Sequence, residues 1–268
     1  MDVEGKRVLI TGGSSGIGLE LARGLAARGA RLVIAARGAA RVDEAVGALN
    51  ASGAEAAGIT ADVVTQIGRT AALQGAIEAF GGLDILVNNA GAVRAGRLDA
   101  IDEEEIRAMI EVDLVAPIML TRAALPLLRA GSESMIVNVS SAIALVAMPF
   151  YATYAAVKAG LSSFGESLRR ELNGEGVRVM TVYPSGTDTP MMATNQAGPE
   201  IGFSLEPAEA VAEAIIAGIE HDAINVVRGG PERQALIDLN SKDPMAIDAH
   251  FLAIKDVFER DVRSHCAL

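Results

Sequence analysis

The feature that most constrains this chain is the alternation of short β-branched runs with longer segments of helical periodicity. The short runs are continuously apolar, which indicates strands buried on both faces. Strands that alternate with helices form a parallel sheet, and right-handed crossovers then give a doubly wound α/β fold with helices on both faces. The seven expected strands span residues 7–11, 31–37, 57–62, 83–89, 135–141, 177–184 and 224–230.

The length of 268 residues permits one large domain or two small ones. No Pro- or Ser-rich linker and no break in composition divides the chain, so we expect a single domain. Residues 1–230 contain every expected strand. Residues 231–268 are predicted to be a mostly helical extension of the same domain.

Cysteine and histidine are too scarce for several kinds of chemistry. Cys266 is the only cysteine, so no intramolecular disulfide can form, and we expect a surface thiol. His221, His250 and His265 show no metal-ligand spacing. We therefore expect no zinc site, and we predict that the three histidines lie on helix surfaces.

Charge and hydropathy exclude two kinds of partner. The net charge of −11 repels nucleic acid. The longest apolar run, residues 142–152, contains Pro149 and is far shorter than the roughly 20 residues that span a bilayer. The first residues are acidic and lead directly into a strand, unlike a secretory signal. We expect a cytoplasmic protein without a membrane span.

Polar and glycine-rich motifs follow five of the expected strands. Ligands of doubly wound sheets bind outside the carboxyl ends of the strands, so these motifs are expected to share one site. They are TGGSSGIG from Thr11, Asp62-Val63, NNAG from Asn88, Ser140-Ser141, and YPSGTDTP from Tyr183.

The loop after the first strand, from Gly12 to Gly18, has glycines spaced G-x-x-x-G-x-G. Such glycines permit a tight turn and let backbone N–H groups approach a pyrophosphate at a helix N-terminus. The same residues match the G-x-S-x-G pattern of serine hydrolases, with Ser14 as nucleophile. A position after the first strand, with His221 the only histidine before the tail, argues against the hydrolase.

The residue at the end of the second strand indicates which dinucleotide is bound. An acid there binds the ribose 2′-hydroxyl of NAD, whereas arginine favours the 2′-phosphate of NADP. This chain has Arg37 and no acid, which predicts NADP (NADPH) as cofactor, with NAD less favoured. Residues 1–41 carry seven basic and three acidic side chains, which either a solvated basic face or an anionic ligand would explain.

Tyr154 and Lys158 stand four residues apart, so they share one face of a helix. Ser141 lies upstream, at the end of the fifth expected strand. Free tyrosine has a pKa near 10, about three units too high for a base at neutral pH, so a nearby cation is required. Together the three side chains can form a proton-transfer site that uses no histidine.

These motifs together resemble the short-chain dehydrogenase/reductase family over about residues 5–230. The resemblance implies a Rossmann-type fold that binds a dinucleotide in residues 1–230 and reversible hydride transfer between nicotinamide and a carbonyl or alcohol. It implies Tyr154 as acid/base, Lys158 as the residue that holds the nicotinamide ribose and lowers the tyrosine pKa, and Ser141 as a donor to the substrate oxygen. The cofactor-binding residues that it implies are Gly12, Ser14, Ser15, Gly16, Ile17, Gly18, Arg37, Asp62, Val63, Asn89, Ala90, Gly91, Tyr154, Lys158, Pro184, Thr187 and Thr189.

Two positions depart from the family pattern. Asp113 stands where the family usually has Asn, the fourth member of a catalytic tetrad. Asp113 is a candidate for that role, but it adds a negative charge near Lys158. Ser185 replaces the usual Gly after Pro184, which would shift the substrate loop slightly.

Substrate, assembly and catalysis leave alternatives open. A non-catalytic NAD(P)-binding regulatory or scaffold protein is the alternative to an enzyme, although such a protein would be free to lose its reacting groups.

The apolar stretch 142–150, with Met191, Met192 and Phe203, indicates either a hydrophobic substrate or core packing and subunit contact. Helices near 103–130 and around Tyr154 resemble those through which the family forms a homo-dimer or homo-tetramer. The tail 231–268 is expected to cover the pocket, extend an interface or pack on the sheet.

Overall fold

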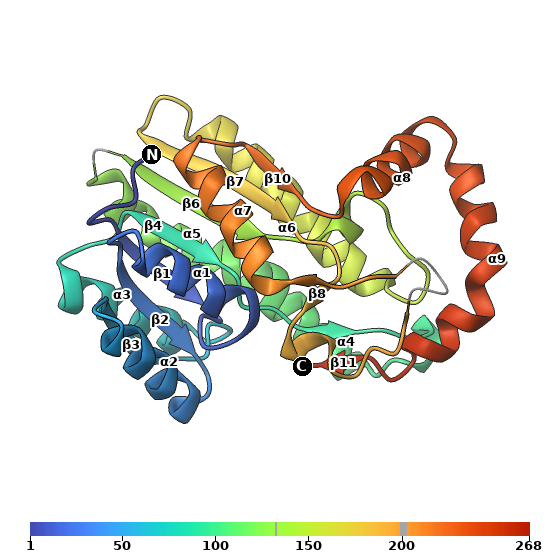
Figure 1. Cartoon of the computed structure of the whole chain (residues 1–268), viewed down its shortest axis with the longest axis horizontal. Helices are drawn as coiled ribbons and strands as arrows, with labels where there is room; N and C mark the ends of the chain where they lie inside the picture. Colours follow the sequence, from blue (N-terminus) through green and yellow to red (C-terminus); the bar gives the residue numbers. More distant parts are fainter. Residues whose placement is uncertain (132, 199–202) are drawn as a thin grey trace.

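The computed structural model describes residues 1–131, 133–198 and 203–268. A seven-stranded sheet forms its centre, with strand order β10-β7-β6-β4-β1-β2-β3 and every neighbouring pair parallel. The predicted fold class and strand count are confirmed. The strands are β1 (Arg7–Thr11), β2 (Arg31–Ala36), β3 (Glu55–Thr60), β4 (Ile85–Asn88), β6 (Ser134–Val139), β7 (Val177–Tyr183) and β10 (Asn225–Val227) (Figure 1).

Helices cover both faces of this sheet (Figure 1). One face carries α1 (Gly16–Ala26), α2 (Ala39–Ala51) and α7 (Ala208–Glu220), and the other carries α3 (Gln66–Phe80), α5 (Ala116–Arg129) and α6 (Ala152–Glu171). Leu25 and Ile215 pack with Ile34 on the first face. Leu120 and Leu168 pack with Leu9 on the second. Because helices bury both faces, the central strands are apolar at successive positions, as the sequence predicted.

The strand order places the binding site. From β1 the chain builds β2 and β3 on one side of the sheet and then crosses to β4 on the other. The loops after β1 and β4 therefore diverge, which opens a crevice at the carboxyl ends of these two strands.

The segment before β6 is helical, but it is interrupted. α4 (Glu103–Ile110) continues through η2 (Glu111–Val115), a π-helical turn, into α5. A π turn adds a residue to one turn of the helix, and such turns occur often at functional sites. Here the turn contains Asp113, whose side chain is fully buried.

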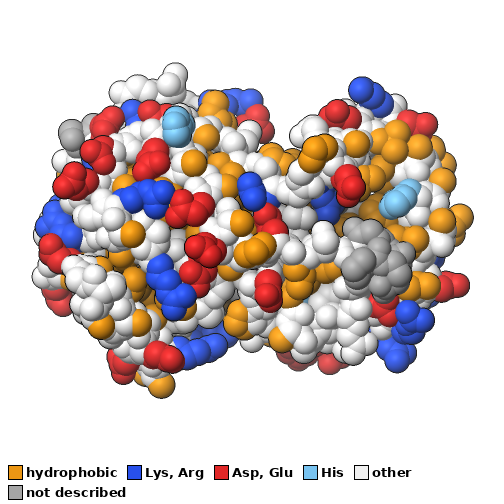
Figure 2. Space-filling view, in the orientation of Figure 1, with side chains coloured by type: hydrophobic (Ala, Val, Ile, Leu, Met, Phe, Trp, Pro, Cys, Tyr) orange, Lys and Arg blue, Asp and Glu red, His pale blue; other side chains and the backbone are white. Residues whose placement is uncertain are grey.

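The predicted helical extension consists of α8 (Gly230–Lys242) and α9 (Pro244–Val262), which arch away from the sheet and return to it (Figure 1). A short strand, β11 (Cys266–Ala267), then pairs antiparallel with β5 (Val93–Arg94). Phe258 and Val262 join a small core with Val93 and Tyr151, which seats the end of α9. Figure 2 shows a notch in the surface between the lobe of α8 and α9 and the rest of the molecule.

Among the residues that the structure describes, no helix is long and apolar enough to cross a membrane, and no His, Cys, Asp and Glu side chains gather as a metal site would require. Cys266 is exposed, as predicted. His221 and His250 are exposed too. The prediction that all three histidines lie on helix surfaces is wrong for His265, which is only 2% exposed and lies between α9 and β11.

Candidate active site

A cavity of about 810 Å³ lies at the carboxyl ends of the strands. Motifs from across the chain meet there, because parallel strands end at the same edge of the sheet. Gly18 and Asp113, which were also predicted for the site, are buried behind its wall. The predicted residues that line it are Gly12, Ser14, Ser15, Gly16, Ile17, Arg37, Asp62, Val63, Asn89, Ala90, Gly91, Ser141, Tyr154, Lys158, Pro184, Thr187 and Thr189.

The glycine loop is held close to the end of β4. The Asn89 side-chain amide donates to the backbone oxygens of Thr11 (2.9 Å) and Gly12 (3.3 Å). A Cβ at Gly18 would lie only 2.5 Å from that amide nitrogen, so the position tolerates no side chain. The N-cap residue Ser15 makes no side-chain capping bond, and the first turn of α1 has no acid. Its backbone N–H groups thus present partial positive charge to the cavity.

The basic N-terminal segment serves two purposes. Arg7 pairs with Asp84, and Arg28 pairs with Glu213, so ion pairs within the fold explain part of its charge. Of the seven basic residues, Arg37 and Arg41 line the cavity. Arg37 is exposed at the end of β2, where its Nη2 donates a long hydrogen bond of 3.4 Å to a backbone oxygen of Leu268.

Ser141, Tyr154 and Lys158 line one part of the cavity. Ser141 begins η3 (Ala142–Ala144), and its Oγ accepts a hydrogen bond from the Ile143 backbone. Lys158 lies one turn after Tyr154 on α6, and its Nζ is 5.6 Å from the centre of the Tyr154 ring. The Ser140 hydroxyl donates to the Lys158 backbone oxygen at 2.8 Å, which fixes α6 against the end of β6.

Lys158 forms a buried ion pair with Asp113, at 2.9 Å between Nζ and Oδ1. The same Nζ donates to the Val139 backbone oxygen at 3.2 Å. Both Asp113 oxygens accept from the Ala92 backbone N–H. An ammonium group has three N–H donors, so Lys158 keeps one for a group in the cavity.

This ion pair also sets the electrostatics of Tyr154. Burial raises the pKa of Tyr154, the Lys158 charge lowers it, and the Asp113 charge raises it again, with a net increase. Burial lowers the pKa of Lys158, but the charge of Asp113 outweighs that effect and the net shift is upward. Lys158 is therefore charged, but Asp113 partly cancels the field by which it would stabilise a phenolate.

Comparison with known proteins shows which family has this fold and these motifs. A sequence model of the short chain dehydrogenase family matches residues 6–200. The chain belongs to the short-chain dehydrogenase/reductase family. It is 32% identical over 225 residues to a ketoacyl reductase of Nostoc sp., covering 83% of this chain and 78% of that protein.

Two solved structures of the short-chain dehydrogenase/reductase family share its architecture. A member from Burkholderia phymatum in complex with NAD has a TM-score of 0.83 and 25% identity, covering 92% of this chain and 96% of that one. A short chain dehydrogenase from Burkholderia cenocepacia in complex with NADP has a TM-score of 0.78 and 35% identity, covering 86% and 98%. The predicted family is confirmed.

In this short-chain dehydrogenase/reductase, sequence reasoning missed a second polar cluster that lines the cavity. The Tyr151 hydroxyl lies 2.8 Å from the His265 Nδ1, and the Asn195 amide donates to that hydroxyl at 3.1 Å. The His265 Nε2 lies 3.0 Å from the Met191 backbone oxygen, which can only accept. Nε2 must therefore carry the proton, and Tyr151 donates to Nδ1. Tyr151 lies one helical turn before Tyr154, and this spacing could have indicated that it faces the same cavity. No sequence pattern links Tyr151 to His265.

Acidification is expected to weaken this cluster. Burial lowers the pKa of His265, so the folded protein binds its proton less readily than the unfolded chain does. The free energy of unfolding should then fall as the pH drops from about 6.5 toward the lowered folded pKa. Chemical denaturation at a series of pH values measures it. His265→Gln should flatten this dependence, and the exposed His250→Gln should keep it; an unchanged slope in His265→Gln would contradict a neutral, buried His265.

Proposed function

We propose that this protein is an NADP(H)-dependent oxidoreductase that transfers a hydride reversibly between nicotinamide and a carbonyl or secondary alcohol. The observation that carries the proposal is that Ser141, Tyr154 and Lys158 line the same cavity as the glycine loop and Arg37. A relative named as a ketoacyl reductase supports a carbonyl substrate. Similar structures hold NADP or NAD, so the preference for NADP rests on Arg37.

The chain fits a bound dinucleotide. The open N–H groups of α1 suit a pyrophosphate, Arg37 suits a 2′-phosphate, and the spare N–H of Lys158 suits a ribose hydroxyl. The other predicted cofactor residues line the cavity between these points. We assign dinucleotide binding and catalysis to residues 1–230, and residues 231–268 extend the same domain along the substrate side.

Bound NADPH supplies the hydride, and the protein's own residues act on the oxygen and the proton. Ser141 and Tyr154 donate hydrogen bonds to the carbonyl oxygen, which strengthen as negative charge develops on it. Tyr154 gives its proton to that oxygen, and the charge of Lys158 stabilises the phenolate that remains. In the oxidative direction the phenolate accepts the proton of the alcohol.

Asp113 is a positioning residue in this proposal. Its carboxylate is buried behind the cavity, where it holds the Lys158 ammonium and is itself fixed by the Ala92 N–H. It thereby takes the structural place of the family's usual Asn through an ion pair.

Substrate and assembly are proposed more coarsely. Ile143, Met148, Met192 and Phe203 line the cavity, which favours a substrate with an apolar body. A homo-dimer or homo-tetramer through α4, α5 and α6 remains a prediction.

The oxidation of NADPH, followed by its absorbance, tests the proposal with ketones, aldehydes, sugars and ketoacyl thioesters. We expect turnover with at least one carbonyl compound and faster turnover with NADPH than with NADH. Tight NADPH binding without turnover of any carbonyl or alcohol would instead favour the non-catalytic binding protein.

Arg37 is expected to determine cofactor preference. Arg37→Ala removes charge-assisted hydrogen bonds to the 2′-phosphate, so the Kd for NADPH should rise about ten- to a hundredfold while the Kd for NADH changes little. Fluorescence titration of both cofactors measures the two values. Arg23→Ala is the matched control, because Arg23 belongs to the same basic segment but pairs with Glu20. An equal change for both cofactors would show that Arg37 does not contact the phosphate.

A further inference from the structure

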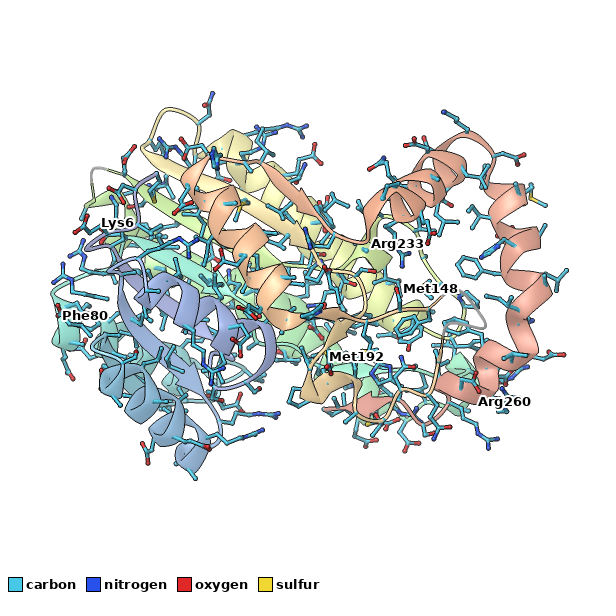
Figure 3. All side chains as sticks on the ribbon, in the orientation of Figure 1. Lys6, Phe80, Met148, Met192, Arg233 and Arg260 are labelled. Atoms are coloured by element: carbon cyan, nitrogen blue, oxygen red, sulfur yellow. The ribbon has the colours of Figure 1, made fainter. Side chains whose placement is uncertain are left out.

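Arg233 lies in the first turn of α8, which follows the last strand of the central sheet. It lines the cavity and is half-buried. Figure 3 shows it at the inner side of α8, near Met148. A Cβ at Gly229 would lie 2.8 Å from the Arg233 Cβ and 3.2 Å from the Ser185 Oγ. The stem of Arg233 therefore packs directly on the backbone at Gly229, beside the Ser185 hydroxyl.

The guanidinium has no hydrogen bond or ion pair with any residue in the described ranges 1–131, 133–198 and 203–268. Of the other cations that line the cavity, Lys158 pairs with Asp113 and Arg107 pairs with Glu103. Arg37 and Arg41 are exposed to water, whereas Arg233 is half-buried. Burial lowers the pKa of Arg233, and no carboxylate of the described residues opposes that effect. A half-buried cation without a counter-charge is stabilised when an anion binds beside it.

The side chains that line the cavity with Arg233 indicate the chemistry of the rest of the ligand. Met148, Met192 and Phe203 line the cavity with Arg233, so an apolar body fits between the reacting groups and the guanidinium. In the part of the chain that the structure describes, the carboxylates that line the cavity are those of Asp62, Glu104 and Glu111. They are exposed and form no ion pair with Arg233.

We propose that Arg233 binds an anionic group of the substrate, and that the substrate is a carbonyl compound with a carboxylate or phosphate at the far end of an apolar body. This inference rests on the proposed function for the reaction, but the anion subsite itself is testable by binding alone. A guanidinium forms paired hydrogen bonds with either anion, so the two sources share one chemistry.

Isothermal titration calorimetry of the 268-residue protein, saturated with NADP⁺, tests the subsite with decanoate, decyl phosphate and decanol. We expect decanoate or decyl phosphate to bind, and Arg233→Met to weaken that binding about ten- to a hundredfold. Arg233→Lys should restore part of the affinity. Arg107→Met removes an ion-paired arginine from the same cavity, and its affinity for the anion should stay within about twofold of the wild-type value. Decanol should bind the three variants and the wild type alike.

Three results would overturn the proposal. They are no binding of either anion to the wild type, an equal loss of decanol affinity in Arg233→Met, and a weaker NADP⁺ affinity in that variant, which would place the guanidinium on the cofactor instead. Tighter binding of decyl phosphate than of decanoate supports the subsite and identifies phosphate as the anion.

Turnover separates this inference from the proposed function. With a long-chain keto acid and its methyl ester, Arg233→Met should lower kcat/KM for the acid and leave the ester unchanged. If no carbonyl compound is reduced but decanoate binding still depends on Arg233, the proposed function fails and the subsite stands. If both compounds are reduced equally well by wild type and variant, the subsite fails and the function stands.

Discussion

Tyr154→Phe is expected to lower kcat by about 10²–10⁴-fold, the usual contribution of a positioned proton donor, while the Kd for NADPH stays within about twofold. The substitution removes the hydroxyl but keeps the ring that packs near Lys158. Loss of the proton donor leaves Ser141 as the one proposed donor to the carbonyl oxygen, so the charge that develops there is less stabilised. Steady-state turnover and fluorescence titration of NADPH give the two quantities.

Tyr183→Phe is the matched control for this experiment. Tyr183 is buried at the end of β7 and does not line the main cavity, so its hydroxyl should not affect turnover. If Tyr154→Phe retained wild-type kcat, Tyr154 would not be the acid. A large loss of NADPH affinity would place its main role in cofactor binding.

Lys158→Met is expected to cost about 3–5 kcal/mol of unfolding free energy, because it leaves a buried carboxylate without its counter-charge. Asp113 is 1% exposed, and among the described residues its one other partner is the Ala92 backbone N–H. For a chain of this size each kcal/mol corresponds to about 2–4 °C in Tm. Calorimetry or denaturant unfolding measures the loss.

The double variant Lys158→Met with Asp113→Asn is the control that isolates the charge. Asn has the same shape as Asp and can still accept from the Ala92 N–H, so most of the lost stability should return. A double variant as unstable as Lys158→Met would mean that packing of the lysine stem, and not the unpaired charge, dominates.

The pH dependence of Lys158→Met follows from Asp113. Burial raises the pKa of Asp113, and the charge of Lys158 opposes that shift in the wild type. Without Lys158 the folded state holds the proton of Asp113 more tightly than the unfolded state does. The deficit should therefore be smallest at acidic pH and should grow as the pH rises through the folded pKa.

The residues show why some parts of the site were predictable. Ser141, Tyr154 and Lys158 are close in sequence, and the end of β6 and the start of α6 bring them to one wall. The glycine loop, Asn89 and Thr189 are far apart in sequence, but each follows a parallel strand, so the sheet brings them together. All parallel strands end at the same edge of the sheet whatever their side chains contact. The strand-end motifs were therefore enough to predict which residues meet in the site.

The missed residues have no such link. His265 reaches Tyr151 across 114 positions, and Arg233 reaches the cavity from a helix that follows the last strand of the sheet. Their places depend on how α8 and α9 arch back, and the packing of Phe258 and Val262 directs that path. Periodicity shows that these segments are helical, but it does not show where they dock.

By itself, the sequence determined the sheet, its seven strands, the family and the edge at which ligands bind, because strand periodicity and strand-end motifs are local properties. The tertiary structure alone decided three features: the ion pair between Asp113 and Lys158, the burial of His265, and the charge of Arg233, which lies beside an apolar wall without a partner among the described residues. Each depends on distances between side chains from separate elements, and burial makes these charges matter, because water no longer screens them.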